Sequence, residues 1–425
     1  MTNPGYKLTE IGEIPDDWDI KPFGELIDLR SSKGVPQTKD VYIIPMEYIP
    51  DNSTSCKFKK SVSGDVIPPT YCEPGDVLMP KITPSVENGK IGIVPELPNS
   101  SAFATSEVFP VVSGPLVDNL FIFYLLKFSP YRQALVNSMI GSTGRQRVPK
   151  SFLLSMNVCF PQLLEQQKIA EILSTADRKI ELIDNEIQAT EKLKKGLMQT
   201  LLTRGIGHTK FKKTEIGEIP EEWEIKKIKD CILPTFSVDP KLAFGQNQFS
   251  YVDVSAVSNE ELKIIDSRNM KGSEAPSRAR KEIKHNDILF ATVRPYLKRV
   301  AIVPYELDGQ ICSTAFCVVR PDIEKMSSNY MFYSLTSDTF VQRVTGLQTG
   351  SAYPAISDGQ VLSALISVPE IEEQQEIAGF LSIFDERLKH LRKMKNGSEL
   401  LRNGLMQGLL TGRVRVKISK FKGAA

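Results

Sequence analysis

Histidine, tryptophan and paired cysteines are scarce in this chain of 425 residues. It has three histidines, two tryptophans and six cysteines. No two cysteines form a Cys-x-x-Cys pair, and His208, His285 and His390 lie far apart. A zinc site is usually marked by close pairs of ligands in the sequence. We therefore expect no metal site, and cysteines that are buried, reduced thiols.

The chain also lacks an excess of charge of either sign. Lys and Arg number 53 and Asp and Glu 51, a formal net charge of +2, so a basic surface for nucleic acid can only be local. No apolar run approaches the roughly 18–20 residues that a membrane helix needs. Residues 1–18 have no apolar signal-peptide core. We expect a cytoplasmic protein of two or three domains.

Motifs that mark catalytic sites are absent as well. The sequence has no Gly-x-x-x-x-Gly-Lys-Ser/Thr phosphate loop, no Gly-x-Ser-x-Gly turn and no Asn/Asp-Pro-Pro-aromatic motif of an adenine methyltransferase. The nearest strings, at residues 67–71 and 141–145, lack required residues. Glu224 with Lys226 matches only part of a nuclease carboxylate set. We expect no catalytic residues in this chain.

What the chain does contain is an internal repeat, the feature to be sought first in any sequence. TEIGEIPDDW at residues 9–18 returns as TEIGEIPEEW at 214–223. Further on, EQQ at 165–167 returns at 373–375, and GLMQ at 196–199 returns at 404–407 with the same offset. The chain therefore consists of two copies of one unit.

Each copy ends in a predicted long helix. Residues 164–202 carry apolar side chains at alternating steps of four and three, the spacing of a coiled-coil seam, with polar defects at Thr190 and Lys194. At 1.5 Å per residue this helix would be about 60 Å long. In the second copy the apolar seam is interrupted by Lys395 and Arg402, and the helix contains Gly397. We therefore expect this helix to be less stable there, with a kink. The predicted helix-pairing residues are Ile169, Leu173, Ile180, Ile183, Ile187, Ile377, Leu381, Phe384, Leu388 and Leu391.

A helix of this length cannot bury an apolar stripe by itself. The two helices could pack on each other, antiparallel or parallel, or each could lie on its own globular domain. The GLMQ ends carry more apolar surface than a two-helix seam needs, which indicates either a further partner or burial under the chain's own domains. The candidates for docking a partner are Leu197, Met198, Leu201, Leu202, Leu405, Met406, Leu409 and Leu410.

The other segments predict globular domains of the α+β class. Short apolar runs bounded by Gly and Pro, such as 77–79, 108–112 and 316–319, are typical of strands. Residues 119–136 and 328–344 have helical spacing. The predicted order is a first globular domain, a long helix, a second globular domain, and a long helix with a C-terminal tail, at residues 1–159, 160–207, 208–367 and 368–425.

Positive charge is locally dense in both copies. Residues 266–299 have an excess of Lys and Arg, and 141–150 contain three cations and no acid. Such mixtures suit phosphate contacts and base reading, although ordinary solvated surface is the alternative for each residue. The loop at 348–353 has other side chains than 141–145, as two readers of different sequences would need. The DNA-binding candidates are Lys81, Thr83, Ser142, Thr143, Arg145, Gln146, Arg147, Lys150, Arg278, Arg280, Lys281, Arg294, Tyr296, Lys298, Arg299, Gln348, Thr349, Ser351 and Tyr353.

With these paired motifs the whole chain resembles the specificity subunit of a type I DNA restriction-modification system. The resemblance implies two target-recognition domains, each reading one half of a bipartite DNA sequence. It also implies that the two long helices form an antiparallel coiled coil, which sets the spacing between the half-sites and docks two methylation subunits. Those subunits would carry S-adenosylmethionine, and restriction subunits would join to cleave DNA. The chain itself would be no enzyme and would hold no cofactor.

Two other functions stay open on the sequence alone. One is a two-headed scaffold whose globular domains bind protein partners instead of DNA. The other is a self-contained nuclease or methyltransferase, against which the missing motifs argue. Because the net charge is small, we expect weak and salt-sensitive DNA binding by the isolated chain.

Overall fold

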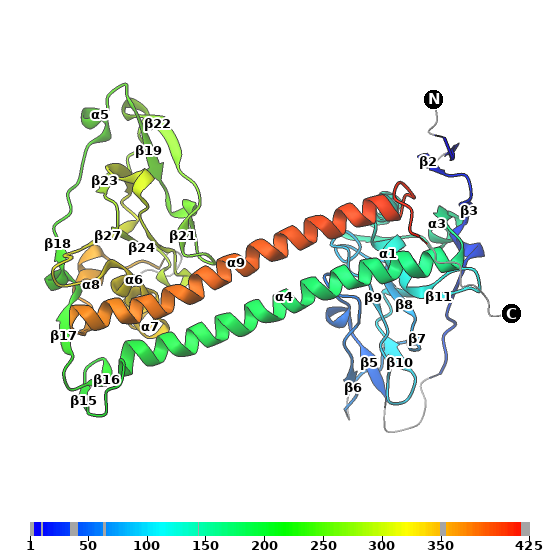
Figure 1. The fold of residues 1–425 in the computed structure, drawn as a ribbon, viewed down its shortest axis with the longest axis horizontal. Coiled ribbons are helices and arrows are strands. Elements are labelled where there is room, and N and C mark those ends of the chain that lie inside the picture. Colours follow the sequence, from blue (N-terminus) through cyan, green and yellow to red (C-terminus); the bar gives the residue numbers. More distant parts are fainter. Residues whose placement is uncertain are drawn as a thin grey trace. The chain divides into compact units, whose positions relative to one another are not determined.

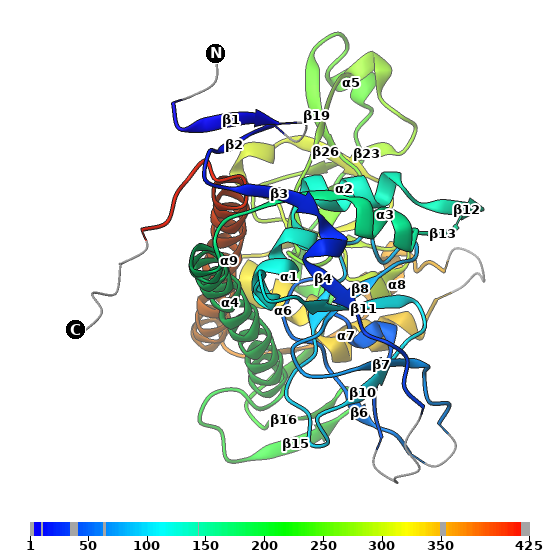
Figure 2. The same cartoon turned by 90° about the vertical axis from the view of Figure 1, so that its right-hand side faces the viewer.

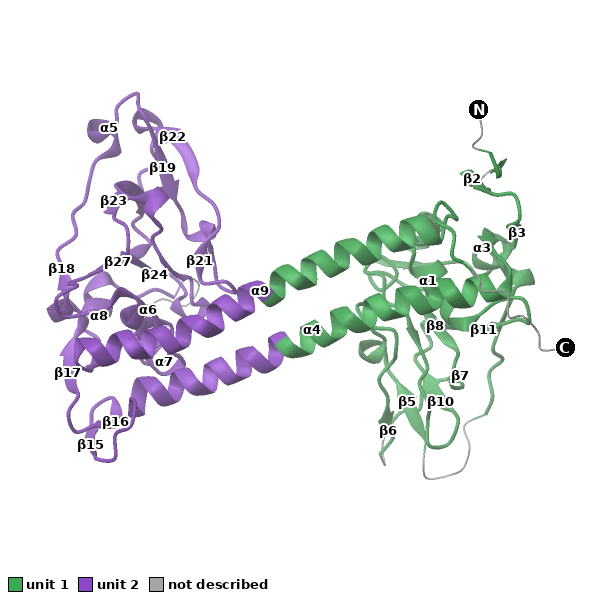
Figure 3. Cartoon of the chain, in the orientation of Figure 1, with its two compact units in different colours: residues 1–186, 391–425 green, residues 187–390 purple. Residues whose placement is uncertain are grey.

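The structure, a computed structural model, describes residues 4–9, 12–34, 41–62, 65–142, 144–348 and 354–417. The chain divides into two compact units, one of residues 1–186 with 391–425 and the other of residues 187–390. Figure 3 colours them separately, and each long helix contributes one part to each unit.

Unit 1 is built from short strands and helices around one core. Two four-stranded sheets have the orders β4-β11-β8-β9 and β6-β5-β10-β7, and β14 pairs with β3. Helix α1 packs on β8, β9 and β11 of the first sheet (Figure 1), α2 packs on α1, and α4 begins after β14. The elements are β1 (Tyr6–Thr9), β2 (Gly12–Pro15), β3 (Asp19–Pro22), β4 (Ile27–Leu29), β5 (Tyr42–Ile44), β6 (Lys59–Lys60), β7 (Thr70–Cys72), β8 (Val77–Pro80), β9 (Gly92–Ile93), β10 (Ala102–Ala104), β11 (Val108–Ser113), α1 (Asn119–Lys127), α2 (Ser129–Asn137), β12 (Ile140–Ser142), β13 (Arg145–Arg147), α3 (Lys150–Ser155), β14 (Asn157–Phe160) and α4 (Leu163–Arg204).

Unit 2 repeats this topology. Its four-stranded sheets have the orders β18-β27-β24-β25 and β22-β19-β26-β23, and β28 pairs with β17. The elements are β15 (Phe211–Thr214), β16 (Gly217–Pro220), β17 (Glu224–Lys227), β18 (Ile232–Leu233), α5 (Pro240–Ala243), β19 (Gln248–Val252), β20 (Val257–Ser258), β21 (Lys263–Ile264), β22 (Arg268–Lys271), β23 (Ala279–Ile283), β24 (Ile288–Ala291), β25 (Val300–Ile302), β26 (Gln310–Ser313), β27 (Phe316–Pro321), α6 (Ser328–Thr336), α7 (Asp338–Thr345), α8 (Asp358–Leu362), β28 (Leu365–Val368) and α9 (Ile371–Leu409).

The matching sheets confirm that the sequence repeat is a repeat of fold. In each second sheet the same central pair is parallel, β10 with β5 and β26 with β19, among antiparallel neighbours. One prediction needs refinement, because the helical stretches 119–136 and 328–344 each form two helices. Phe128 and Ser337 are extended between them, where Pro130 and the cap of Ser337 start the second helix.

The long helices run antiparallel to each other inside each unit. In unit 1, Asp177 of α4 pairs with Arg402 of α9, and Asp184 pairs with Lys395. The residue number therefore rises along α4 where it falls along α9. In unit 2, Lys194 pairs with Asp385. The parallel and the separate-helix alternatives are therefore wrong.

Three polar interruptions of the predicted seam form these interhelical ion pairs. Lys194, Lys395 and Arg402 each face an aspartate of the partner helix. Helix α9 continues through Gly397 without a break. Of the predicted pairing residues, Phe384 is only half-buried, and the others are buried: Ile169, Leu173, Ile180, Ile183, Ile187, Ile377, Leu381, Leu388 and Leu391.

A tyrosine of each globular part joins the interhelical ion pair. The Tyr124 hydroxyl of α1 donates to Asp177 at 2.9 Å, and the Tyr333 hydroxyl of α6 donates to Asp385 at 2.6 Å. Burial, followed by the neighbouring aspartate, raises the pKa of Tyr124 above its usual range, so this hydroxyl remains a donor. The repeated contact ties each globular part to both helices.

The repeated Glu-Gln-Gln motif has a structural explanation. The side-chain oxygen of Gln166 accepts from the Asp118 N–H, and its nitrogen donates to the carbonyls of Leu116 and Pro161. Gln374 makes the same three bonds, to Ser327, Lys325 and Pro369. Both glutamines are fully buried, so each satisfies backbone groups that would otherwise be orphaned.

The glutamate before each glutamine is held by a basic side chain, an arginine in unit 1 and a histidine in unit 2. In unit 1, Arg415 lies between Glu165 and Asp17, with contacts of 2.7–2.9 Å. In unit 2, His208 lies between Glu373 at 3.0 Å and Glu222 at 2.9 Å. Each of these basic residues follows one long helix, and its glutamate starts the other helix, so these contacts join the helix ends within each unit.

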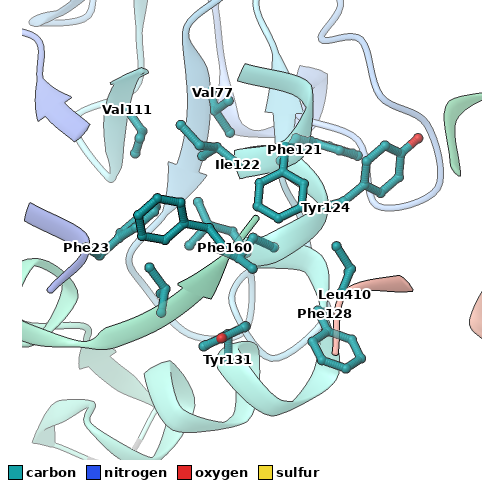
Figure 4. Close-up of a cluster of buried hydrophobic side chains, with 14 of the residues drawn as sticks. Phe23, Val77, Val111, Phe121, Ile122, Tyr124, Phe128, Tyr131, Phe160 and Leu410 are labelled. Carbon is teal, nitrogen blue, oxygen red and sulfur yellow. The ribbon is translucent and has the colours of Figure 1, made fainter. Parts of the chain in front are cut away.

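The apolar GLMQ ends are packed under the chain's own domains, which corrects the docking prediction. Leu201 and Leu202 are buried in the core of unit 2, with Leu197 and Met198 partly buried against it. Met406, Leu409 and Leu410 are buried in the core of unit 1, with Leu405 at its margin. Figure 4 shows Leu410 near the aromatic side chains of α1 and α2. These apolar side chains therefore pack inside the units, which was one of the two alternatives that the sequence allowed.

The cysteines are buried as expected. All six lie in described segments and form no disulfide. Burial raises the pKa of the Cys56 and Cys72 thiols to about 12, so both remain neutral near pH 7. Within the described residues, no helix has both the length and the apolar character to cross a membrane.

Candidate nucleic-acid interface

In unit 1, the fold brings together two groups of candidates that are distant in sequence. The loop after β8 pairs with β13: the Thr83 N–H donates to the Gln146 carbonyl at 3.1 Å, and the Val148 N–H donates to the Lys81 carbonyl at 2.8 Å. Ile82 and Arg147 form the β-bridge between these bonds. Lys81 and Thr83 therefore lie beside Gln146 and Arg147. We call this arrangement the loop bridge.

Beyond the loop bridge, β12 and β13 form a two-stranded ribbon that projects from the unit (Figure 2). Ser142 pairs with Arg145, and both are exposed. Gly141 has a φ of +132°, and a Cβ there would lie 2.6 Å from the Arg145 carbonyl oxygen, so the ribbon requires glycine. Lys150 is exposed at the start of α3. Thr143 lies outside the described residues.

A glutamate that no sequence pattern indicated lies beside the loop bridge. Glu107, just before β11, accepts two hydrogen bonds from Arg147, from Nη2 at 2.8 Å and from Nε at 3.1 Å. These bonds hold the pKa of the Glu107 carboxyl below its usual range. Glu107 is 40 residues from Arg147, so no local pattern could have found the pair.

Unit 2 repeats the loop bridge with different side chains. The Arg294 N–H donates to the Pro354 carbonyl at 2.8 Å, and the Ile356 N–H donates to the Thr292 carbonyl at 3.0 Å. Val293 and Ala355 form the β-bridge. Arg294 is exposed, and it occupies the place that Thr83 has in unit 1.

Four of the six cationic DNA-binding candidates of unit 2 have acid or carbonyl partners within the unit. Lys281 donates to Asp358 and to the Phe316 carbonyl. Lys298 donates to Asp338 and to the Thr336 carbonyl. The Arg299 guanidinium donates to the carbonyls of Val254 and Val257, and Arg280 pairs with Asp239 at 2.8 Å. The side chains of Lys281 and Lys298 are also only 18% and 29% exposed, so they present less charge to a phosphate than an exposed, unpaired cation would.

The candidates of unit 2 that remain on the surface are fewer. Arg278 and Arg294 are exposed, and the Tyr296 side chain is 48% exposed. Gln348 is partly buried at the end of the segment after α7. Thr349, Ser351 and Tyr353 lie outside the described residues. Among the described residues, no group of three or more His, Cys, Asp and Glu side chains is arranged to hold a metal ion.

Known proteins resemble this chain along its whole length. A specificity subunit of a type I restriction enzyme of Methanocaldococcus jannaschii, MjaVIII, is 28% identical over 422 residues, covering 96% of this chain and 95% of its own. The MjaX specificity subunit of that organism, described as putative, is 27% identical and covers 97% of both chains. A crystal structure of the S subunit of a type I restriction-modification system from M. genitalium has the same fold, with a TM-score of 0.55 at 14% identity over 99% of this chain and 100% of that one.

A family model matches both copies of the repeat. Its description is the type I restriction modification DNA specificity domain, and it covers residues 15–192 and 220–397. Each match runs from the end of the first β-hairpin of a copy into its long helix, so the matched segments contain both loop bridges. The chain therefore belongs to the family of type I restriction-modification DNA specificity proteins.

Proposed function

We propose that the chain is the DNA sequence-specificity subunit of a type I restriction-modification enzyme, and that each unit reads one half of a bipartite target. The observation that carries the proposal is the loop bridge. Both units form it with the same backbone hydrogen bonds, while the side chains on it differ. A constant scaffold with different polar side chains is what two readers of different sequences need, because base edges are recognised by side chains.

The surface chemistry supports contact with duplex DNA. The β12–β13 ribbon carries Ser142, Arg145 and Gln146, and a two-stranded ribbon fits the major groove. Only part of the predicted positive charge is displayed, because Lys281, Lys298 and Arg299 of unit 2 donate to acids or carbonyls of their own unit. Low displayed charge favours weak DNA binding by the chain alone, and the phosphate contacts that remain should weaken as salt is raised.

Other subunits complete the proposed enzyme. Two methylation subunits would dock on the long helices and supply the S-adenosylmethionine chemistry, and restriction subunits would cleave DNA. The chain contributes recognition and no catalysis, and the assembly works in the cytoplasm. Because α4 and α9 pair in both units, the helices are suited to fix the spacing between the half-sites.

The test is co-expression of the chain with its cognate methylation subunit in a host that methylates no adenine, followed by single-molecule methylation sequencing. We expect a split motif with methyladenine in both halves. Exchanging residues 215–367 for those of another specificity subunit is expected to change one half of the motif and leave the other intact. If the purified complex is stable and no new methylation occurs, the two-headed protein scaffold is favoured instead. A change in both halves would refute the assignment of one half to each unit.

A further inference from the structure

Glu107 and Arg147 form an ion pair at the loop bridge of unit 1, in a place where unit 2 has neither charge. The Lys81 N–H donates to the Glu107 carbonyl at 3.0 Å, and the Thr292 N–H donates to the Ala315 carbonyl at 2.8 Å in the equivalent bond. The equivalent β-bridge residues are Arg147 and Ala355. Unit 1 therefore has Glu and Arg where unit 2 has two alanines.

Stability does not explain this pair. The side chains of Arg147 and Glu107 are 57% and 26% exposed, and a surface ion pair contributes about 0–1 kcal/mol to stability. Unit 2 forms the same backbone bonds with Ala315 and Ala355, so the fold of the bridge does not depend on the charges.

The geometry leaves both groups able to bind a ligand. Arg147 uses Nε and Nη2, one side of the guanidinium, to hold the carboxylate. Its Nη1 group has no hydrogen bond among the residues that the structure describes, so the end of the guanidinium can donate elsewhere. A carboxylate has about four lone-pair positions, and Glu107 uses two of them for Arg147. Each side chain therefore retains hydrogen-bonding capacity while the partner fixes its orientation.

The charge of the pair argues against a phosphate as its ligand. Glu107 is an anion close to the cations Arg147 and Lys81, and both lower the pKa of its carboxyl. An ionised carboxylate repels phosphate and can only accept hydrogen bonds. A ligand that satisfies both groups must offer acceptors to the guanidinium and a donor to the carboxylate.

A G·C base pair offers that combination in the major groove. Guanine presents the acceptors O6 and N7, which suit a bidentate arginine, and cytosine presents the N4 amino group, which suits a carboxylate. The pair lies beside the projecting β12–β13 ribbon, an element that fits the same groove. Resting on the proposed function, we propose that Glu107 and Arg147 are a specificity-determining pair of unit 1 that reads one G·C base pair of its half-site.

The test uses the full chain, co-expressed with the methylation subunit, and single-molecule methylation sequencing. The double variant E107A/R147A gives unit 1 the residues that unit 2 has at this place. We expect one G·C position in one half of the motif to become degenerate, while the other positions and the other half are unchanged. A good bidentate pair discriminates against the wrong base by about 5- to 150-fold, so methylation at sites with other base pairs should rise by that factor.

A second variant and a control keep the test decisive. E107Q keeps the shape of the side chain but replaces an acceptor by a donor, and it should lower methylation of the wild-type motif at the same position. The control K21A/E25A removes another exposed ion pair of unit 1, whose side chains are 40% and 58% exposed, and should leave the motif unchanged. The thermal unfolding midpoint of each purified variant shows that the fold is retained.

The remaining outcomes separate the inference from the proposed function. An unchanged motif in E107A/R147A, or a uniform loss of methylation at all positions as expected of a phosphate contact, overturns the base-reading pair. Degeneracy at a position that is not G·C also overturns it. If the wild-type complex produces no bipartite motif at all, it is the proposed function that fails.

Discussion

Replacing Asp177 with alanine is expected to destabilise unit 1 by about 3–5 kcal/mol, because it leaves buried charge uncompensated. Asp177 is 5% exposed, accepts from the Tyr124 hydroxyl at 2.9 Å and lies 3.3 Å from Arg402 Nη1. Lys127 is a second cation nearby: burial lowers its pKa, and the negative charge of Asp177 partly raises it again. Without Asp177, Arg402 and Lys127 lose the carboxylate that attracts both of them, and their mutual repulsion is less compensated.

The two tryptophans allow this effect to be measured in unit 1 alone. Trp18 is buried in the core of unit 1 and Trp223 in that of unit 2. In a chain carrying W223F, urea unfolding followed by fluorescence therefore reports on Trp18. The matched control is D184A, because the side chains of Asp184 and Lys395 are each 30% exposed, and its removal should cost about 0–1 kcal/mol. Equal losses for D177A and D184A would contradict a role for buried charge.

The same pairs show what the sequence could and could not predict about the helices. The alternation of steps of four and three is local, so it predicted α4 and its apolar face within two residues at each end. Lys194 and Arg402 looked like defects of that face. Their aspartate partners are 191 and 225 residues away, and no pattern within one helix contains that information.

The candidate interface was predicted in part for a related reason. Counting cations located the segment with Arg145 and Arg147, which the structure displays on a ribbon. The same count could not show that Lys281 is paired with an acid, because its partner Asp358 is 77 residues further along the chain. Charge density in a sequence does not distinguish a displayed cation from one that is neutralised inside the fold. The repeat gave more information, because it revealed that two equivalent places carry different side chains.

Lys127 offers a test of the opposite sign, because its replacement should stabilise the protein. Its ammonium nitrogen is buried at the end of α1, has no hydrogen-bond partner among the described residues and lies 5.2 Å from the centre of the Phe123 ring. Burial lowers the pKa of Lys127 to about 8, and Asp177 only partly offsets this effect. K127M should stabilise unit 1 by about 2 kcal/mol at pH 7, because no charge is then buried without a hydrogen bond.

The pH dependence of this effect identifies its cause. The pKa of Lys127 is lower in the folded chain than the ordinary value of 10.5, so between about pH 8 and pH 10.5 the unfolded chain binds more protons. The stability of wild-type unit 1 should therefore rise with pH across that window, and below pH 8 the full penalty remains. In the W223F background, the gap between K127M and wild type should be largest at pH 7 and shrink at pH 9.5. The control K168M replaces a lysine whose side chain is 46% exposed and should show no such trend; a K127M gap that is the same at both pH values would mean that the ammonium charge is not its cause.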